Sequence, residues 1–462
     1  MSNYKTSIGI EVHAQLKTKT KMFCGCPVSF GKEANTNVCP VCLGLPGTLP
    51  SLNRKAVELA IKAGLALGCK IHLESFFARK NYLYPDLAKG YQITQYKFPL
   101  ATSGGIMVGE KEVRIRRVHL EEETAKLIHE KDRSLIDYNR SGLPLIEIIT
   151  EPDIDSPELA VDYLKKLQKI LQSSNISGAV MARGEFRCEP NISVSKVKGK
   201  LGTRTEVKNL NSFKAVKNSI SSEIERQIKT LEKGGIIEQV TIHYSEETGK
   251  TWAARSKEEA SDYRYFPEPD LPPLLIDENR IEKIKEGLEE LPEAKVGRFI
   301  ELGLLEEDAV TISDSKKASG LFEETLKILS EPSEISKWLV RDYRSLGEPD
   351  VAAKDFAEMI KMILDGRISR NAAAEVFAEM VKTKKTPGQI VKEKNLSKIS
   401  DSATLEQAVG EVFKENTDEA TRFKNGERKL LGFFIGQVMK KTGGKADPKE
   451  VSRIISLYEE KY

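Results

Sequence analysis

The sequence contains no long apolar run and almost no excess of charge. No apolar stretch approaches the roughly 18–20 residues that a membrane-spanning helix requires, so we expect no membrane insertion. Lys and Arg number 72 against 69 Asp and Glu, which gives a formal net charge of +3. A protein that binds nucleic acid through its total charge is therefore excluded, and any such binding requires a local basic patch.

Several common motifs are also missing. The chain has neither G-x-x-x-x-G-K-[ST] nor G-x-G-x-x-G, which argues against a P-loop and against a dinucleotide-binding domain. No Ser/His/Asp or Cys/His nucleophilic arrangement is recognisable. The first ten residues, MSNYKTSIGI, contain neither an apolar core nor a small-residue cleavage site. We therefore expect no secretory signal and a cytoplasmic location.

Cysteine is scarce, with six residues in 462, but four of the six are clustered. They form a C-x-C…C-x-x-C pattern with twelve residues between the two pairs, which is typical of a tetrahedral Zn²⁺ site. The alternative is four reduced thiols without a metal. We expect a structural zinc knuckle over residues 24–42, because every ligand position would be filled by Cys24, Cys26, Cys39 and Cys42.

Strand alternation predicts a second kind of cation site. In the first strand, Glu11 and His13 share the polar face. Glu147 stands in the middle of the apolar segment LPLIEIIT, where burial of an unpaired carboxylate is costly. With the Glu121–Glu123 run, these groups suit Mg²⁺ bound together with nucleotide phosphates. Periodicity does not choose among the three carboxylates of that run, and the alternative is a set of solvated carboxylates at a sheet edge.

Polar and aromatic residues gather in three further segments. Residues 77–96 include Lys80 and Tyr82 and are typical either of a loop that meets a nucleotide or nucleic-acid end or of a solvated hairpin. Polar strands are expected at 181–195 and 202–220. They indicate either a substrate- or phosphate-binding rim or a sheet with one wet face. The residues of this predicted rim are Arg187, Asn191, Arg204, Glu206, Lys208, Asn209 and Asn211.

Length and pattern together predict an α+β protein with several domains. Capped helices are expected at 53–68, 156–175 and about 213–233. From about residue 292 the pattern changes to short helices with almost no strands. The tail, 421–462, has ten Lys and Arg against five Asp and Glu, which indicates either contact with an RNA backbone or a merely solubilising surface.

Six motifs in this order resemble one known family, the B subunits of the tRNA-dependent aspartyl/glutamyl-tRNA amidotransferases. The resemblance extends from the first strand to the basic tail. The motifs are IGIEVHAQLKT (8–18), RKNYLYPDLAKGYQITQ (79–95), HLEEETAK (119–126), DYNRSGLPLIEIITEPDI (137–154), KNLNSF (208–213) and DYRYFPEPDLPPL (262–274).

The resemblance implies a fold and an activity. Residues 1–292 would form a glutamine-synthetase-like cradle with an antiparallel sheet. Residues 293–393 would form a helical domain, and 394–462 a YqeY-like tail that grips tRNA. The cradle would use ATP and Mg²⁺ to phosphorylate the side-chain carboxylate of Glu or Asp misacylated on tRNA(Gln) or tRNA(Asn). A separate glutaminase subunit would supply ammonia, and a small third subunit would complete a heterotrimer.

The resemblance also assigns residues. Glu11, His13, Glu122 and Glu147 match the family's metal-binding positions, so the family selects Glu122 from the acidic run. Lys80 would serve the catalytic cradle. The substrate-binding positions would be Tyr82, Arg187, Glu189, Asn191, Lys208, Asn209 and Asn211.

Two features set the chain apart from the usual family pattern. The family usually reads R-C-D-A-N where this chain reads Arg187-Cys188-Glu189-Pro190-Asn191, so Glu189 must reach the same point with one more methylene. The four clustered cysteines occur only in a subset of the family. Two other functions stay open: a noncatalytic tRNA-binding scaffold and a free-standing ATP-dependent carboxylate–amine ligase.

Overall fold

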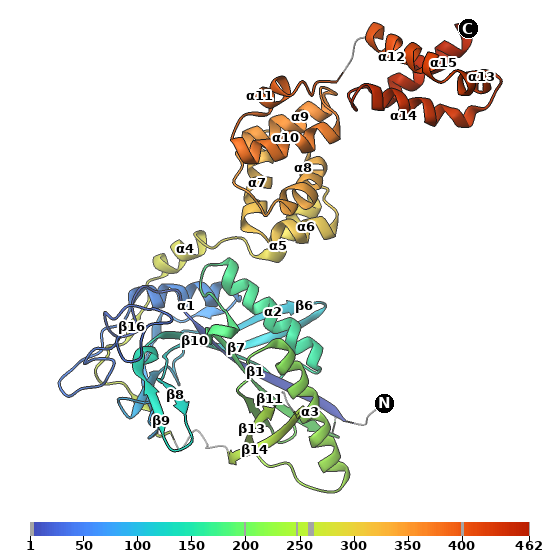
Figure 1. Ribbon diagram of the computed structural model, residues 1–462. Coiled ribbons are helices and arrows are strands. Elements are labelled where there is room, and N and C mark those ends of the chain that lie inside the picture. The colour runs from blue at the N-terminus through green and yellow to red at the C-terminus, as the bar shows by residue number, and fades with distance from the viewer. Residues whose placement is uncertain (1–3, 198–199, 246–247, 257–262, 399–401, 462) are drawn as a thin grey trace. The chain divides into compact units, whose positions relative to one another are not determined.

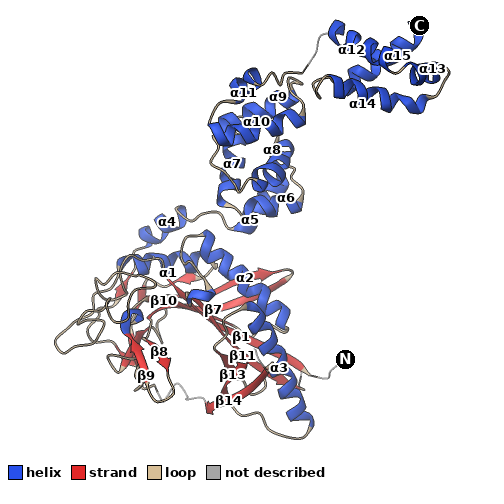
Figure 2. Ribbon diagram, viewed as in Figure 1, coloured by secondary structure: helices blue, strands red, loops and turns tan. Residues whose placement is uncertain are grey.

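The computed structural model describes residues 4–197, 200–245, 248–256, 263–398 and 402–461. The chain divides into two compact units, Met1–Leu291 and Pro292–Tyr462. The first unit contains the sheets and the second is helical (Figures 1 and 2). No described helix combines the length and the apolar character needed to cross a membrane.

A large sheet dominates the first unit. Its strands run in the spatial order β14-β13-β12-β11-β1-β10-β7-β5-β4-β15, with β6 beside β7 and β2 beside β6. The strands are β1 (Lys5–Gln15), β2 (Lys70–Ile71), β4 (Ala78–Asn81), β5 (Tyr91–Thr94), β6 (Ala101–Val108), β7 (Lys111–Glu122), β10 (Pro144–Thr150), β11 (Phe186–Ser195), β12 (Thr205–Lys208), β13 (Val240–Ser245), β14 (Lys250–Ser256) and β15 (Phe266–Pro267). Two small sheets pair β3 (Glu74–Ser75) with β16 (Leu274–Leu275) and β8 (Lys126–His129) with β9 (Ser134–Asp137).

Helices cover one face of this sheet, as Figure 1 shows for α1 (Arg54–Ala66), α2 (Pro157–Ser173) and α3 (Phe213–Glu232). Asn53 caps α1, and Ser156 caps α2 just before Pro157, as their positions in the sequence predict. The covered face of β1 presents Ile8, Ile10, Val12 and Ala14, which are completely buried. Each buried Ile or Val stabilises the fold by about 1.5–3 kcal/mol, so this face fixes the register and turns Glu11 and His13 to the other side.

The resemblance implies an antiparallel sheet, but the observed sheet is mixed. The pair β12–β13 runs parallel, whereas the other pairs are antiparallel within the described residues. Parallel neighbours need a long crossover connection, and here α3 forms it between β12 and β13. The motif at 262–274 overlaps the short strands β15 and β16; residue 262 lies outside the described residues.

The second unit contains two separate hydrophobic cores. One is centred on Trp338, Phe356 and Phe377, and the other on Phe413, Phe423 and Phe434. Leu396, just beyond the predicted boundary at 393/394, still packs against the first core, and the second core begins at Leu405. The three-domain division stays a prediction. A short α4 (Glu278–Glu286) ends the first unit. The helices of the second are α5 (Pro292–Glu301), α6 (Glu306–Ser313), α7 (Lys316–Leu326), α8 (Pro332–Trp338), α9 (Ala353–Leu364), α10 (Arg370–Thr383), α11 (Pro387–Glu393), α12 (Ser402–Glu415), α13 (Thr417–Lys424), α14 (Leu431–Lys441) and α15 (Pro448–Lys461).

Candidate active site

The uncovered face of the large sheet carries a row of charged residues on four adjacent strands. In the register, His13 lies opposite both Glu147 and Arg187, and Glu147 lies opposite His119. Directly paired residues in a sheet point to the same side, so these side chains converge. They line a cavity of about 710 Å³. The sheet register therefore assembles this site from segments more than a hundred residues apart.

The first cluster in the cavity is His13, Glu121 and Glu147. One potential ligand atom from each lies within 4.8 Å of the others. The Nε2 atom of His13 is 3.0 Å from Glu121 Oε1 and 3.9 Å from Glu147 Oε2. His119, which is buried, places its Nε2 atom 2.8 Å from the same Glu147 oxygen. An imidazole and two carboxylates form a donor set that fits a divalent cation.

The charges of this cluster are strongly coupled. Burial on its own would lower the pKa of His13, but Glu121 and Glu147 outweigh burial and raise the pKa to about 9. Burial would raise the pKa of Glu147, but His119, His13 and Lys80 hold it well below its usual range. A proton on His13 thus balances the carboxylates in the absence of a cation, and a bound cation would take over that role.

A second cluster lies beside the first and consists of Glu11, Glu189 and Glu206, again with ligand atoms within 4.8 Å of one another. Lys208 Nζ lies 2.9 Å from Glu189 Oε2 and 3.5 Å from Glu206 Oε1. Although burial opposes ionisation, Lys208 and His13 lower the pKa of Glu189 to about 2. Three carboxylates with one ammonium leave a net negative charge, so this site also suits a hard cation.

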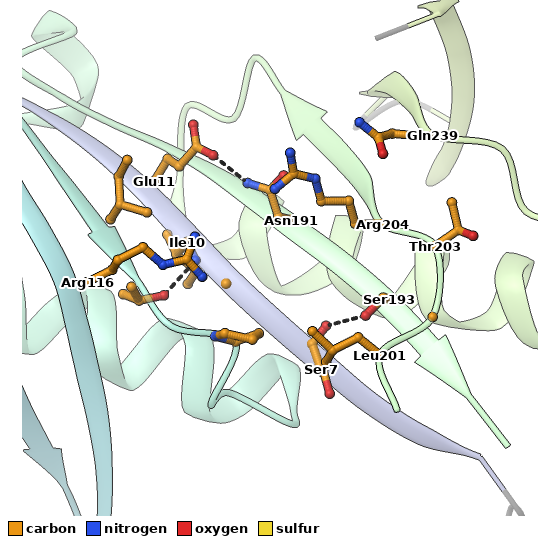
Figure 3. A pocket seen from close by; sticks show the side chains of 15 residues that line it. Ser7, Ile10, Glu11, Arg116, Asn191, Ser193, Leu201, Thr203, Arg204 and Gln239 are labelled. Carbon is orange, nitrogen blue, oxygen red and sulfur yellow. Dashed lines mark hydrogen bonds between the residues drawn. The ribbon is translucent and has the colours of Figure 1, made fainter. Parts of the chain in front are cut away.

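A neighbouring cavity of about 450 Å³ shares Glu11, Arg204 and Gln239 with the first. Figure 3 shows Arg116 and Arg204 on opposite sides of β1 in the lining of this cavity, with Asn191 next to Arg204. Asn191 Nδ2 donates to Glu11 Oε1 over 3.0 Å. The two cavities thus share Glu11 of the second acidic cluster, and guanidinium groups line the smaller one.

The four clustered cysteines form a separate site. Their sulfur atoms lie within 4.8 Å of one another, and the backbone N–H of Cys39 donates to Cys42 Sγ over 3.2 Å. Hydrogen bonding from Cys24, opposed by burial and helped by that backbone N–H, lowers the pKa of Cys42 to about 4. Four converging soft ligands that include an easily ionised thiol fit a tetrahedral zinc ion.

Comparison with known proteins identifies the family. A model of the GatB/GatE catalytic domain matches residues 6–282, and a model of the GatB domain matches residues 320–457. The B subunit of the aspartyl/glutamyl-tRNA(Asn/Gln) amidotransferase of Thermodesulfovibrio yellowstonii is 48% identical over 98% of both chains. The corresponding subunits of Persephonella marina and Thermotoga maritima are 47% and 44% identical, with the same coverage.

The chain belongs to the B-subunit family of these amidotransferases. The resemblance drawn from the six motifs is thereby confirmed, and the chain is an amidotransferase subunit with a GatB/GatE catalytic domain. Both acidic clusters and the cysteine cluster lie inside the stretch that matches this catalytic domain.

The structure places Glu121, and not the predicted Glu122, beside His13. On β7, residues alternate between the two faces, so Glu121 joins His119 in the large cavity and Glu122 points away. The Glu122 carboxylate pairs with Lys89 and accepts from the backbone N–H of Ile93 over 2.9 Å. It lines a different pocket of about 260 Å³, next to Cys24 and Cys42. In this protein, Glu121 occupies the position beside His13 that was expected of Glu122.

The other predicted residues divide into two groups. Lys80, Tyr82, Arg187, Glu189 and Lys208 line the large cavity, and Asn191 lines the smaller one. Glu11 belongs to the second acidic cluster and not to the cluster of His13 and Glu147.

Two of the predicted substrate-binding residues lie elsewhere. Asn209 and Asn211 are exposed and line neither cavity. The Nδ2 atom of Asn209 lies 3.0 Å from Nδ1 of His243.

Two roles were missed by reasoning from the sequence. His119 lies beside Glu147 on the neighbouring strand, with its Nε2 atom 2.8 Å from the Glu147 carboxylate. Glu206, which the sequence placed only in the predicted rim, completes the second acidic cluster. Strand parity carried a usable signal for the first, since His119 and Glu121 are two residues apart and therefore share a face. The signal for Glu206 was weaker, because it depends on the pairing of Glu206 with Asn191 across β12 and β11.

Proposed function

We propose that this protein amidates the side-chain carboxylate of Glu misacylated on tRNA(Gln), or of Asp misacylated on tRNA(Asn), in an ATP-dependent reaction. The names of the curated relatives describe aspartyl/glutamyl-tRNA(Asn/Gln) amidotransferases. The observation that carries the proposal is the pair of acidic clusters on one sheet face, both of which line the large cavity. Paired cation sites beside guanidinium groups are suited to phosphoryl transfer.

The chemistry requires activation of a poor electrophile. A carboxylate does not react with ammonia because oxide is a very poor leaving group, and phosphorylation replaces it with phosphate. Mg²⁺ at the two clusters would act as a Lewis acid on phosphoryl oxygens. The chain's own residues would position the reactants and neutralise their negative charge. Arg116 and Arg204 would face the nucleotide phosphates, and Lys80 and Lys208 would face the substrate carboxylate and the developing phosphate.

Ammonia must come from elsewhere in the assembly. We propose that a glutaminase subunit supplies it and that a small third subunit is a further partner, because the motif resemblance implies a heterotrimer and the relatives are themselves named as B subunits. We further propose that the sheet unit is a glutamine-synthetase-like cradle and that 394–462 is a YqeY-like tail that contacts tRNA. A cytoplasmic location suits the six free thiols.

The test is substitution of Glu147 in the assembled complex. We expect Glu147→Ala, and the isosteric Glu147→Gln, to reduce ATP hydrolysis dependent on misacylated tRNA by about 100-fold or more. Neither glutamine hydrolysis by the glutaminase partner nor assembly of the complex should change. Glu225→Ala serves as the matched control, because Glu225 is an exposed carboxylate on α3 whose salt-bridge partner is Lys229. Normal turnover in the Glu147 variants would contradict the assignment and favour a noncatalytic scaffold.

A further inference from the structure

Four tyrosines, Tyr82, Tyr96, Tyr263 and Tyr265, gather in the lining of the large cavity. Tyr96 and Tyr265 stack with ring centroids 4.1 Å apart and planes within 5° of each other. Tyr263 makes edge-on contacts with Tyr265 at 6.1 Å and with Tyr82 at 5.8 Å. All four residues line the cavity and are half-buried. Rings in an active-site wall that keep exposed surface offer stacking area to a ligand.

Cations accompany these rings. Lys80 Nζ lies 4.8 Å from the ring centroid of Tyr263, and the Arg117 guanidinium lies 5.9 Å from that of Tyr96. Within the described part of the chain, the hydroxyl groups of the four tyrosines have no hydrogen-bond partner. A tyrosine hydroxyl is protonated at neutral pH and can donate. Aromatic faces, cations and unused donors together are the usual surroundings of a stacked nucleobase.

The position of the tyrosine wall decides which of two nucleotides, ATP or the terminal nucleotide of the tRNA, it is suited to bind. The proposed reaction brings together ATP and the end of a tRNA, and two neighbouring cavities with shared lining residues are available. The smaller cavity is lined by Arg204 and by Arg116, whose guanidinium also donates to Glu151 over 3.0 and 2.7 Å, and both can meet a triphosphate. The tyrosine wall instead adjoins the His13–Glu121–Glu147 cluster, since Tyr265 and Lys80 interact electrostatically with both carboxylates. A carboxylate carried on a nucleoside that stacks here would lie toward that cluster.

We propose that Tyr82, Tyr96, Tyr263 and Tyr265 form a stacking platform for a purine nucleoside, the terminal adenosine of the tRNA acceptor end. The inference rests on the proposed function, because that function supplies the tRNA. The platform holds the base, and the esterified Glu or Asp side chain reaches the first acidic cluster. The ATP adenine is the competing source of a purine, and the experiment separates the two.

The experiment is a binding cycle with the full chain in its complex. Uncharged tRNA with its terminal adenosine and the same tRNA trimmed by that one nucleotide are titrated against wild type, Tyr265→Ala and Tyr263→Ala. We expect trimming to weaken binding to wild type by about fivefold or more, and to have no effect in the two variants. Tyr84→Ala is the matched control, because Tyr84 is exposed in the same segment and lines neither cavity; it should respond to trimming as wild type does.

Equal effects of trimming in wild type and in the tyrosine variants would overturn the proposal, as would no effect of trimming in wild type. The Kd of ATP is measured in parallel, and its loss in the variants with an intact trimming effect would assign the platform to the ATP base instead. Tyr265→Phe, which keeps the ring, should retain the trimming effect even if Tyr265→Ala is unstable. Because the cycle measures binding without turnover, its failure is distinct from a failure of wild type to amidate misacylated tRNA.

Discussion

Lys21 is fully buried beside the cysteine cluster, an unusual position for an ammonium group. Its Nζ atom donates to the backbone oxygens of Asn37, over 2.9 Å, and Tyr138, over 3.4 Å, and lies 3.6 Å from Cys42 Sγ. A zinc ion with four thiolates has a net charge of −2, which is costly at a site of low dielectric constant. The ammonium of Lys21 would offset part of that charge and so favour the loaded form of the site.

A substitution separates this electrostatic role from a purely structural one. We expect Lys21→Met to lower zinc affinity about 10- to 100-fold, the range seen for groups that support metal ligands. The measurement is the rise in unfolding midpoint on adding zinc to the metal-free protein. If Lys21 only satisfied the two carbonyl groups, the midpoint would fall equally with and without zinc. Lys21→Arg, which keeps the charge, should retain part of the zinc-dependent rise.

His13 makes stability depend on pH when no divalent cation is added. Its pKa is about 9 in the folded protein and about 6.5 in an unfolded chain. Since the folded state holds the proton more tightly, the stabilisation is complete below about pH 6.5 and is lost as the pH rises through 9. The full effect is at most about 3 kcal/mol.

Urea unfolding at pH 6.5 and pH 9 provides the measurement. Wild type should lose more stability over this interval than His13→Gln, which cannot titrate. Identical losses would show that His13 carries no proton in the folded state at neutral pH. Adding Mn²⁺ should reduce the difference, because a bound cation displaces the proton.

At the scale of the element, β7 shows what strand parity can and cannot decide. Glu121 and Glu122 are neighbours in sequence and both are buried, yet they serve different pockets on opposite faces of one strand. A shift of one residue in the register would exchange them. Leu120 and Val118 are buried in the core on the same face of the strand as Glu122, and their burial holds the observed register.

This geometry predicts opposite results for two conservative variants. Glu121→Gln should weaken Mn²⁺ binding at the His13 cluster by about tenfold or more, because it removes a charged ligand. Glu122→Gln should leave Mn²⁺ affinity within about twofold, because its carboxylate faces Lys89. Electron paramagnetic resonance titration of free Mn²⁺ measures both. Equal losses of Mn²⁺ affinity in the two variants would mean that Glu121 and Glu122 do not lie on opposite faces of β7 in solution.

Local signals were sufficient for much of the fold. The capped helices α1 and α2 and the hydrophobic face of β1 follow from residues close together in the sequence. The parallel pair β12–β13 could not be predicted, because it depends on where a crossover helix returns the chain. The division of the acidic residues into two clusters was also out of reach. It depends on the register between strands as distant as β1 and β12, and Glu11 and His13 are on the same face of one strand but serve different clusters.

At the scale of the molecule, the two hydrophobic cores of the helical unit suggest where a truncation is tolerated. Leu396 still packs against the first of these cores, whereas the second begins at Leu405. A chain ending at Lys398 should therefore keep the sheet unit and the first helical core. We expect it to bind tRNA about tenfold or more weakly, with a shallower dependence on salt, because basic residues of the tail are lost. ATP affinity should not change, and unchanged tRNA affinity would contradict a role for the tail.

The position of β1 has a consequence for synthesis on the ribosome. β1 is made before its partners in the sheet, β10 and β11, which end at Thr150 and Ser195. At about 5–20 residues per second, the apolar side of β1 waits on the order of ten seconds or more for its neighbours. Contacts between such distant segments also form slowly once the chain is complete. The same strand that gathers both acidic clusters thus makes the nascent protein dependent on protection from aggregation.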